Sequence, residues 1–134
     1  MNPYLFVYGS LLKTIAHAMG ERLRAEAALV GSATVQGRLY RVSWYPAIIE
    51  SSADADRVHG EVYRLENPAA SLAWLDAYEG LTRDASSVTE PDEYQRVERP
   101  ARLASNHDII NAWVYLYRHP VTGLGHIASG RWEA

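Results

Sequence analysis

Two short segments of the chain contain residue types and spacings that suit catalysis. In the first, Tyr8-Gly9-Ser10-Leu11, an apolar stretch ends in a Gly-Ser turn ahead of a helical pattern. Such a turn presents free backbone N–H groups that can bind a carboxylate or a developing oxyanion without a counter-charge. Gly-Ser is also common in ordinary turns, so both interpretations stay open. Ser10 has little support as a nucleophile, because no G-x-S-x-G motif surrounds it and no histidine is placed as its partner.

The second segment, Leu75-Asp76-Ala77-Tyr78-Glu79-Gly80, ends a predicted helix with two carboxylates three positions apart. Side chains at i and i+3 lie on neighbouring parts of one helix face. The segment is rich in apolar surface, which disfavours a charged carboxylate and raises its pKa toward values useful for acid/base catalysis. Glu79 also lies at the negative end of the helix dipole, which acts in the same direction. The alternative is a solvated surface pair.

Tyrosines recur on two predicted strands. Tyr94 and Arg96 alternate on one strand, and Tyr115 and Tyr117 alternate on the next, so each pair shares a face. These phenols suit either the wall of a polar pocket or ordinary packing inside a barrel.

The composition excludes several kinds of chemistry. The chain has 134 residues, no cysteine and a single lysine, Lys13, and its length predicts one domain over residues 1–134. Without cysteine there is no disulfide scaffold, thiolate metal site or cysteine nucleophile. The five histidines have no metal-ligand spacing and no nucleotide-binding motif occurs, so we expect no metal and no cofactor. The formal net charge of −3 gives no basic footprint for nucleic acid.

No targeting or membrane segment is expected. The N-terminal apolar run Tyr4–Tyr8 has the length of a strand, well short of the ~20 residues that span a bilayer. It has no charged start and no A-x-A cleavage site. The prediction is a cytoplasmic protein that does not contact a membrane.

Strand patterns dominate the chain. The segment GSATVQGRLYRV has a strand pattern with glycines that permit a bulge or a sharp bend, and Pro46 marks a strand edge or end. A hairpin is expected around Ser105-Asn106 and an irregular tail after it. The other predicted strands are Tyr4–Tyr8, Val58–Leu65, Tyr94–Leu103 and Ile109–Tyr117.

Two helices accompany these strands. Thr14 is a candidate cap for a helix over Ile15–Leu23, and the alanines of Ala25–Leu29 favour extending it until Gly31. Asn67 and Pro68 suit the cap and first position of a second helix that ends at Gly80. The predicted fold class is α+β: a small, mixed, partly closed β-barrel of about five to seven strands with two or three short flanking helices.

The motifs occur in a familiar order. FVYGSLL is followed by GRLYRVSWYPAII, HGEVYRL, LDAYEG, EYQR, AWVYLY and SGRW. This order resembles the gamma-glutamylcyclotransferase-like family over nearly the whole chain, and YGSL and LD-x-[YF]-EG are its most specific parts.

The resemblance implies a small barrel with flanking helices, and it assigns roles to particular residues. The loop Tyr8, Gly9, Ser10 and Leu11 would bind the substrate through backbone N–H groups, Glu79 would be the general acid/base, and Tyr94 would lie beside the pocket. The family reaction closes a γ-glutamyl group to 5-oxoproline and releases an amine, with no metal or cofactor. Arg131 departs from the pattern, because relatives often have an acidic residue before the final Trp, and this leaves the C-terminal edge of the pocket open.

The expected function is therefore cyclisation of a small γ-glutamyl amine or peptide. Two alternatives stay open: a binding module without turnover on the same scaffold, and a hydrolase that releases glutamate. The residues predict neither the leaving amine nor the oligomeric state.

Overall fold

The structure is a computed structural model that describes residues 1–9, 18–79 and 93–133. These residues form eight strands and two helices. The barrel strands are β1 (Tyr4–Val7), β2 (Ala27–Gln36), β5 (Arg57–Leu65), β6 (Tyr94–Leu103) and β7 (Ile109–Tyr117). The remaining strands are β3 (Arg38–Arg41), β4 (Pro46–Ile49) and β8 (Gly125–Ile127). The helices are α1 (Ala18–Glu26) and α2 (Pro68–Tyr78).

Five strands close into a mixed barrel in the order β1-β5-β2-β6-β7, and β4-β3-β8 form a second, smaller sheet. All barrel pairs are antiparallel except the parallel contact of β1 with β7, where Leu5 is paired with Trp113. The predicted α+β class and small mixed barrel are confirmed. The barrel is closed rather than partly closed, because strands from the two ends of the chain meet and leave no exposed barrel edge.

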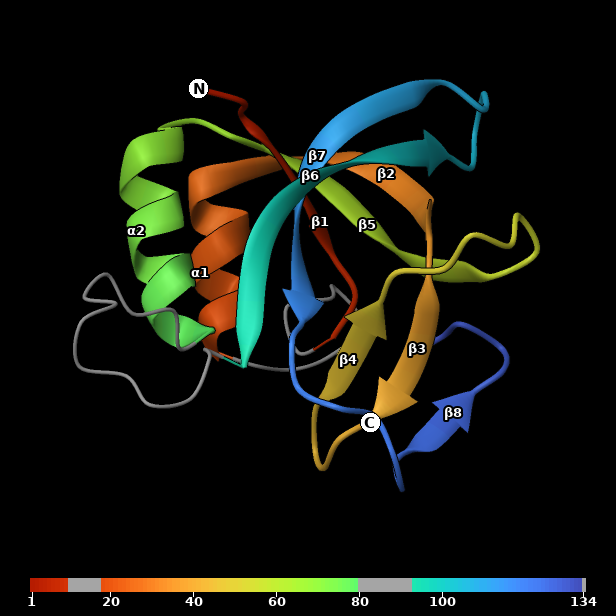
Figure 1. Cartoon of the computed structure of the whole chain (residues 1–134). Helices are drawn as coiled ribbons and strands as arrows, with labels where there is room; N and C mark the ends of the chain where they lie inside the picture. Colours follow the sequence, from red (N-terminus) through yellow and green to blue (C-terminus); the bar gives the residue numbers. More distant parts are fainter. Residues whose placement is uncertain (10–17, 80–92, 134) are drawn as a thin grey trace.

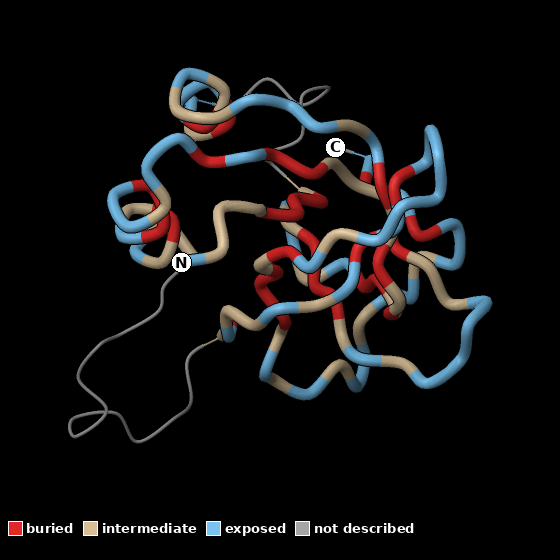
Figure 2. Tube along the Cα trace, turned by 90° about the horizontal axis from the view of Figure 1, so that it is seen from above, coloured by how far each residue is buried: buried red, intermediate tan, exposed pale blue. Residues whose placement is uncertain are grey.

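Both helices lie on one side of the barrel, and the small sheet lies away from them (Figure 1). The buried residues concentrate where these elements face one another (Figure 2). Leu39 and Ile48 of the small sheet belong to the same buried cluster as the barrel residues Leu5, Val62 and Val114. Among the described residues, neither helix has the length and apolar character needed to cross a membrane.

The start of α2 follows the predicted chemistry. The Asn67 side chain accepts a hydrogen bond from the Ala70 N–H at 3.3 Å, and Pro68 occupies the first helical position. In α1, Leu23 is fully buried and Met19 packs against the core, as the helical spacing predicts. The predicted cap Thr14 lies outside the described residues.

The predicted extension of the first helix through Ala25–Leu29 is correct as far as Glu26, where α1 ends, and wrong from Ala27 onward. Strand β2 begins at Ala27 and pairs with β5 along its whole length, from Ala27 opposite Leu65 onward. Gly31 lies within β2 at a register shift rather than at a helix end. Alanine favours helix by only a fraction of a kcal/mol per residue, so a long ladder of strand pairing overrides it.

Gly37 turns the chain from the barrel into the small sheet. A side chain there would place a Cβ 2.9 Å from the Ile49 carbonyl oxygen, so only glycine permits this close corner. Pro46 starts the edge strand β4, in agreement with the expected strand edge.

The predicted irregular tail contains one strand. Residues Gly125–Ile127 form β8 and pair with β3, Leu39 being opposite Ile127. Three residues are too few for a periodic pattern, and the pairing depends on an open edge of β3 that only the fold provides.

Asp76 connects α2 to the barrel through hydrogen bonds and an ion pair. Its carboxylate accepts hydrogen bonds from Arg96 Nε at 2.8 Å, Arg96 Nη2 at 3.2 Å and the Tyr115 hydroxyl at 2.6 Å. The Arg96 guanidinium also lies over the Trp113 ring, 4.4 Å from its centroid. Both members of the ion pair are largely buried, with side-chain exposures of 17% for Asp76 and 20% for Arg96.

Replacing Asp76 by Asn is expected to lower the free energy of unfolding by about 2–4 kcal/mol, because the Arg96 charge is left without its partner. Urea denaturation measures the change. The exposed Asp54→Asn is the matched control and should shift stability by less than about 0.5 kcal/mol. An equally small change in the Asp76 variant would contradict a structural role for this ion pair.

Candidate active site

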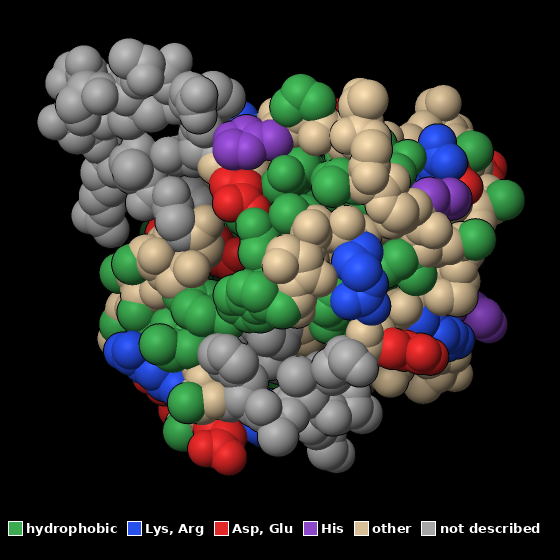
Figure 3. All heavy atoms as spheres, turned by 90° about the horizontal axis from the view of Figure 1, so that it is seen from below, with side chains coloured by type: hydrophobic (Ala, Val, Ile, Leu, Met, Phe, Trp, Pro, Cys, Tyr) green, Lys and Arg blue, Asp and Glu red, His purple; other side chains and the backbone are tan. Residues whose placement is uncertain are grey.

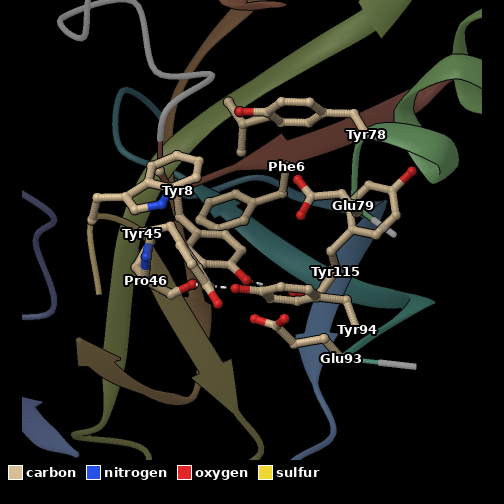
Figure 4. A pocket seen from close by; sticks show the side chains of 12 residues that line it. Phe6, Tyr8, Tyr45, Pro46, Tyr78, Glu79, Glu93, Tyr94 and Tyr115 are labelled. Carbon is tan, nitrogen blue, oxygen red and sulfur yellow. Dashed lines mark hydrogen bonds between the residues drawn. The ribbon is translucent and has the colours of Figure 1, made fainter. Parts of the chain in front are cut away.

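A cavity of about 270 Å³ opens where β1 ends, β4 and β6 begin and α2 terminates. Its walls are mostly aromatic, and two carboxylates line it (Figure 4). The described lining residues are Phe6, Val7, Tyr8, Gly9, Trp44, Tyr45, Pro46, Tyr78, Glu79, Glu93, Tyr94 and Tyr115.

Glu79 is placed in this cavity by the end of α2. It is the C-cap residue, and its backbone N–H donates to the Leu75 carbonyl oxygen at 2.9 Å. The side chain is partly buried. Burial raises the pKa of the Glu79 carboxyl from 4.5 to about 7, and the negative charge of Glu93 acts in the same direction. Glu79 is therefore poised to exchange a proton near neutral pH.

Asp76 and Glu79 have separate surroundings, although they lie three positions apart. Asp76 is neutralised by Arg96, whereas no salt bridge to Glu79 is found among the described residues. The alternative of a solvated surface pair therefore does not describe these side chains.

The hydroxyl groups of three lining tyrosines are already used within the protein. Tyr8 donates to the Tyr115 carbonyl oxygen at 2.6 Å, Tyr94 donates to the Pro46 carbonyl oxygen at 2.6 Å, and Tyr115 donates to Asp76. Burial raises the pKa of each of these phenols above its ordinary value. They are rigid neutral walls whose protons are committed to other partners.

Gly9 brings the main chain close to the opposite wall. A Cβ at this position would lie 2.9 Å from Pro46 Cγ and 3.0 Å from Pro46 Cδ. The absence of a side chain therefore keeps the backbone beside the cavity.

The structure brings together Tyr8, Gly9, Glu79 and Tyr94, which come from three separate segments of the chain. Ser10 and Leu11 lie outside the described residues. It stays a prediction that Glu79 is catalytic. It also stays a prediction that the substrate is bound by Tyr8, Gly9, Ser10, Leu11 and Tyr94.

Several lining residues were not predicted as part of the site, among them Trp44, Tyr45 and Glu93. Tyr45 precedes the strand-edge proline, and Glu93 directly precedes Tyr94. Their position next to these predicted features could have indicated that they lie near the site. Strict strand alternation would place Glu93 on the face opposite Tyr94. Glu93 precedes the first residue of β6, so this alternation does not hold there.

The C-terminal segment packs on the core and is not part of the described cavity lining. Trp132 is buried against the core, and Arg41 lies over its ring at 4.2 Å. Arg131 is exposed. Neither Arg131 nor Trp132 is among the described residues that line the cavity.

On the face seen from below, hydrophobic side chains cover much of the described surface, with acidic and basic groups among them (Figure 3). Across the described residues, no three His, Asp or Glu side chains converge as metal ligands.

The fold and the cavity together define a small α+β barrel protein with an aromatic-lined, carboxylate-containing pocket. The chain belongs to the family described as gamma-glutamyl cyclotransferase, AIG2-like, whose profile matches residues 5–134.

Known relatives agree with this assignment. The gamma-glutamylcyclotransferase family protein YtfP of Escherichia coli K12 is 35% identical over 130 residues, covering 96% of this chain and 94% of YtfP. The solution structure of E. coli ytfP has a TM-score of 0.64 at 34% identity, covering 96% of this chain and 95% of that one. An AIG2-like protein from Mus musculus has a TM-score of 0.71 at 20% identity, over 98% of this chain and 88% of that one, which supports the fold.

Proposed function

We propose that this protein cyclises the γ-glutamyl group of a small γ-glutamyl amine or peptide to 5-oxoproline and releases the amine. The observation that carries the proposal is Glu79, a carboxyl with a pKa of about 7 inside the aromatic cavity of a gamma-glutamyl cyclotransferase family barrel.

The nucleophile of this reaction belongs to the substrate. The α-amine attacks the γ-carbonyl carbon, a five-membered lactam closes, and the bond to the leaving nitrogen breaks. Because the amine is already tethered to its target, the protein needs mainly to hold the chain in its folded conformer. The rigid tyrosine walls and the cavity volume suit that task.

One carboxylate can perform both proton transfers. Glu79 in its ionised form accepts the proton that the attacking amine loses, and then donates it to the departing nitrogen. A pKa near 7 leaves a substantial fraction of the carboxyl ionised at neutral pH and makes its protonated form an adequate acid. The backbone N–H groups of the Gly9–Leu11 segment are proposed to bind the γ-oxygen or the substrate's α-carboxylate.

The proposal is tested by incubating the purified protein with a panel of γ-glutamyl amines and γ-glutamyl peptides and identifying the products by mass spectrometry. We expect 5-oxoproline and the free amine in equal amounts. Release of glutamate would instead indicate a hydrolase, and binding without any product would indicate a non-catalytic module.

Ser10→Ala is expected to retain at least about a third of wild-type kcat/KM, because the proposed mechanism uses the backbone of this loop and not the hydroxyl. Steady-state assay of 5-oxoproline release measures it. A loss as large as that of a Glu79 variant, accompanied by a trapped acyl-enzyme in the wild type, would favour a serine nucleophile.

A further inference from the structure

A second cavity is separate from the candidate active site. Its volume is about 360 Å³, which is enough for a small organic molecule. It lies where β2 and β6 end and β5 and β7 begin, on the side of the barrel away from the helices (Figure 1). The candidate active site lies instead where β6 begins, and no described residue lines both cavities.

The lining of this second cavity has an excess of positive charge. It contains three arginines, Arg57, Arg99 and Arg102, and one acidic residue, Glu50. Glu50 forms an ion pair with Arg99 and neutralises it. No salt bridge to Arg57 or Arg102 is found in the described part of the chain. The described lining therefore has a formal net charge of +2, although that of the whole chain is −3.

The Arg57 guanidinium is held in a fixed orientation by Thr34 of the neighbouring strand β2. Arg57 Nε donates to Thr34 Oγ1 at 3.1 Å, and Arg57 Nη2 donates to the Thr34 carbonyl oxygen at 3.1 Å and to Oγ1 at 2.9 Å. None of these described hydrogen bonds uses Nη1. The N–H groups of Nη1 are therefore available to a ligand, and the guanidinium needs no further ordering to present them.

Arg102 brings a second positive charge to the same place. Thr34, which binds Arg57, is directly opposite Arg102 in the pairing of β2 with β6. Burial lowers the pKa of Arg57, the positive charge of Arg102 acts in the same direction, and Asp54 has a smaller opposing effect. Two like charges that are partly removed from water repel each other, and an anion bound between them offsets that repulsion.

A phosphate group matches this arrangement better than a carboxylate does. At neutral pH a phosphate monoester carries a charge of about −1.5 to −2, which balances the charge of the lining, whereas a carboxylate carries a single negative charge. Its three terminal oxygens can accept hydrogen bonds from two guanidinium groups at once. Pro100 and Ile109 add apolar surface beside the arginines, and Ile109 is 57% exposed. This surface suits the organic part of such a molecule.

We propose that the second cavity binds a small phosphorylated molecule, with its phosphate group between Arg57 and Arg102 and its organic part against Ile109. The inference is independent of the proposed cyclotransferase function, because the two cavities share no described lining residue.

The test is a titration of the ¹⁵N-labelled protein at pH 7.5 and constant ionic strength, followed by NMR through the Nε–H signals of its arginines. The probes are inorganic phosphate, phenyl phosphate, acetate and chloride. Both phosphates are expected to give saturable shifts at Arg57 and Arg102, and phenyl phosphate should bind about threefold or more tightly than inorganic phosphate because it buries apolar surface. Equal responses to acetate or chloride would show charge screening only and would overturn the inference.

Arg102→Gln is expected to raise the Kd of phenyl phosphate by about tenfold or more, the range of a charge-assisted hydrogen bond. Its stability to urea should not fall, because the variant removes a like charge beside Arg57. Arg64→Gln is the matched control, since Arg64 is an exposed arginine of β5 outside the cavity lining. The control should keep the wild-type Kd, and an unchanged Kd in Arg102→Gln would overturn the inference.

Ile109→Ser tests where the organic part lies. This variant should bind inorganic phosphate as the wild type does and lose the preference for phenyl phosphate, and a preference that survives would overturn the placement against Ile109. A single-stranded oligonucleotide is the last probe. If it binds more tightly than phenyl phosphate and loses this binding in Arg102→Gln, the arginines serve a nucleic acid and the inference of a small ligand is overturned.

Discussion

Glu79→Gln is expected to lower kcat for 5-oxoproline release by about 10²–10⁴-fold, the usual contribution of a general acid/base. The amide is nearly the same size as the carboxyl but neither accepts the proton of the attacking amine nor passes it to the departing nitrogen. Single-turnover and steady-state assays of 5-oxoproline formation measure the loss. In the wild type, kcat/KM should rise with pH through an apparent pKa of about 7 as Glu79 ionises.

Glu66→Gln provides the control, since Glu66 is an exposed glutamate next to the other end of α2. It should retain wild-type turnover. Turnover by Glu79→Gln within threefold of the wild type would remove Glu79 from the mechanism.

Although Glu79→Gln should lose turnover, its free energy of unfolding should be higher than that of the wild type at alkaline pH. Folding raises the pKa of Glu79 from 4.5 to about 7, so the protonated form is favoured in the folded state. The stability that this carboxyl contributes is full below pH 4.5 and is lost as the pH rises through 7. Glu79→Gln is uncharged throughout, and its free energy of unfolding should exceed that of the wild type by about 1–3 kcal/mol at pH 8.5. The difference should vanish near pH 4, and urea denaturation at both pH values measures it.

Gly60→Ala is expected to destabilise the protein by about 3 kcal/mol or more and to reduce activity through the same distortion. A Cβ on Gly60 would collide with the Val7 carbonyl oxygen and lie 2.7 Å from Phe6 Cζ. Neither β1 residue can yield cheaply, because both are almost fully buried. Val7 leads directly into Tyr8 and Gly9, so a displaced β1 also displaces the wall of the cavity. Denaturation and 5-oxoproline assays measure the two effects.

Gly125→Ala is the matched control for that variant. Gly125 lies in β8, and a Cβ there would meet no atom within 4 Å. Its effect on unfolding should be below about 0.5 kcal/mol. A Gly60 variant as stable as the Gly125 variant would show that β1 shifts freely against β5.

Local sequence patterns predicted much of the fold. The predicted hairpin strands Tyr94–Leu103 and Ile109–Tyr117 have the bounds of β6 and β7. Asn67 and Pro68 located the start of α2. These features succeeded because each depends on side chains within a few residues of one another, so that period and capping chemistry are visible along the chain.

Features that depend on distant partners were not visible in the same way. Ala27–Leu29 became strand because β5 pairs with it, and Gly125–Ile127 became strand because β3 has an edge to share. Closure of the barrel required β1 and β7 to meet. Each outcome is decided by hydrogen bonds across more than thirty positions of sequence, which no local propensity encodes.

The same distinction between local and long-range features applies to the candidate site. The sequence by itself determined the residue types available and nominated Tyr8, Gly9, Glu79 and Tyr94, through a turn, a helix end and an ordered set of motifs. Only the tertiary structure separated Asp76, which is neutralised by Arg96, from Glu79, whose pKa burial raises to about 7. It also brought in Glu93, because desolvation and charge coupling depend on which side chains surround a group, and that is set by the closed barrel.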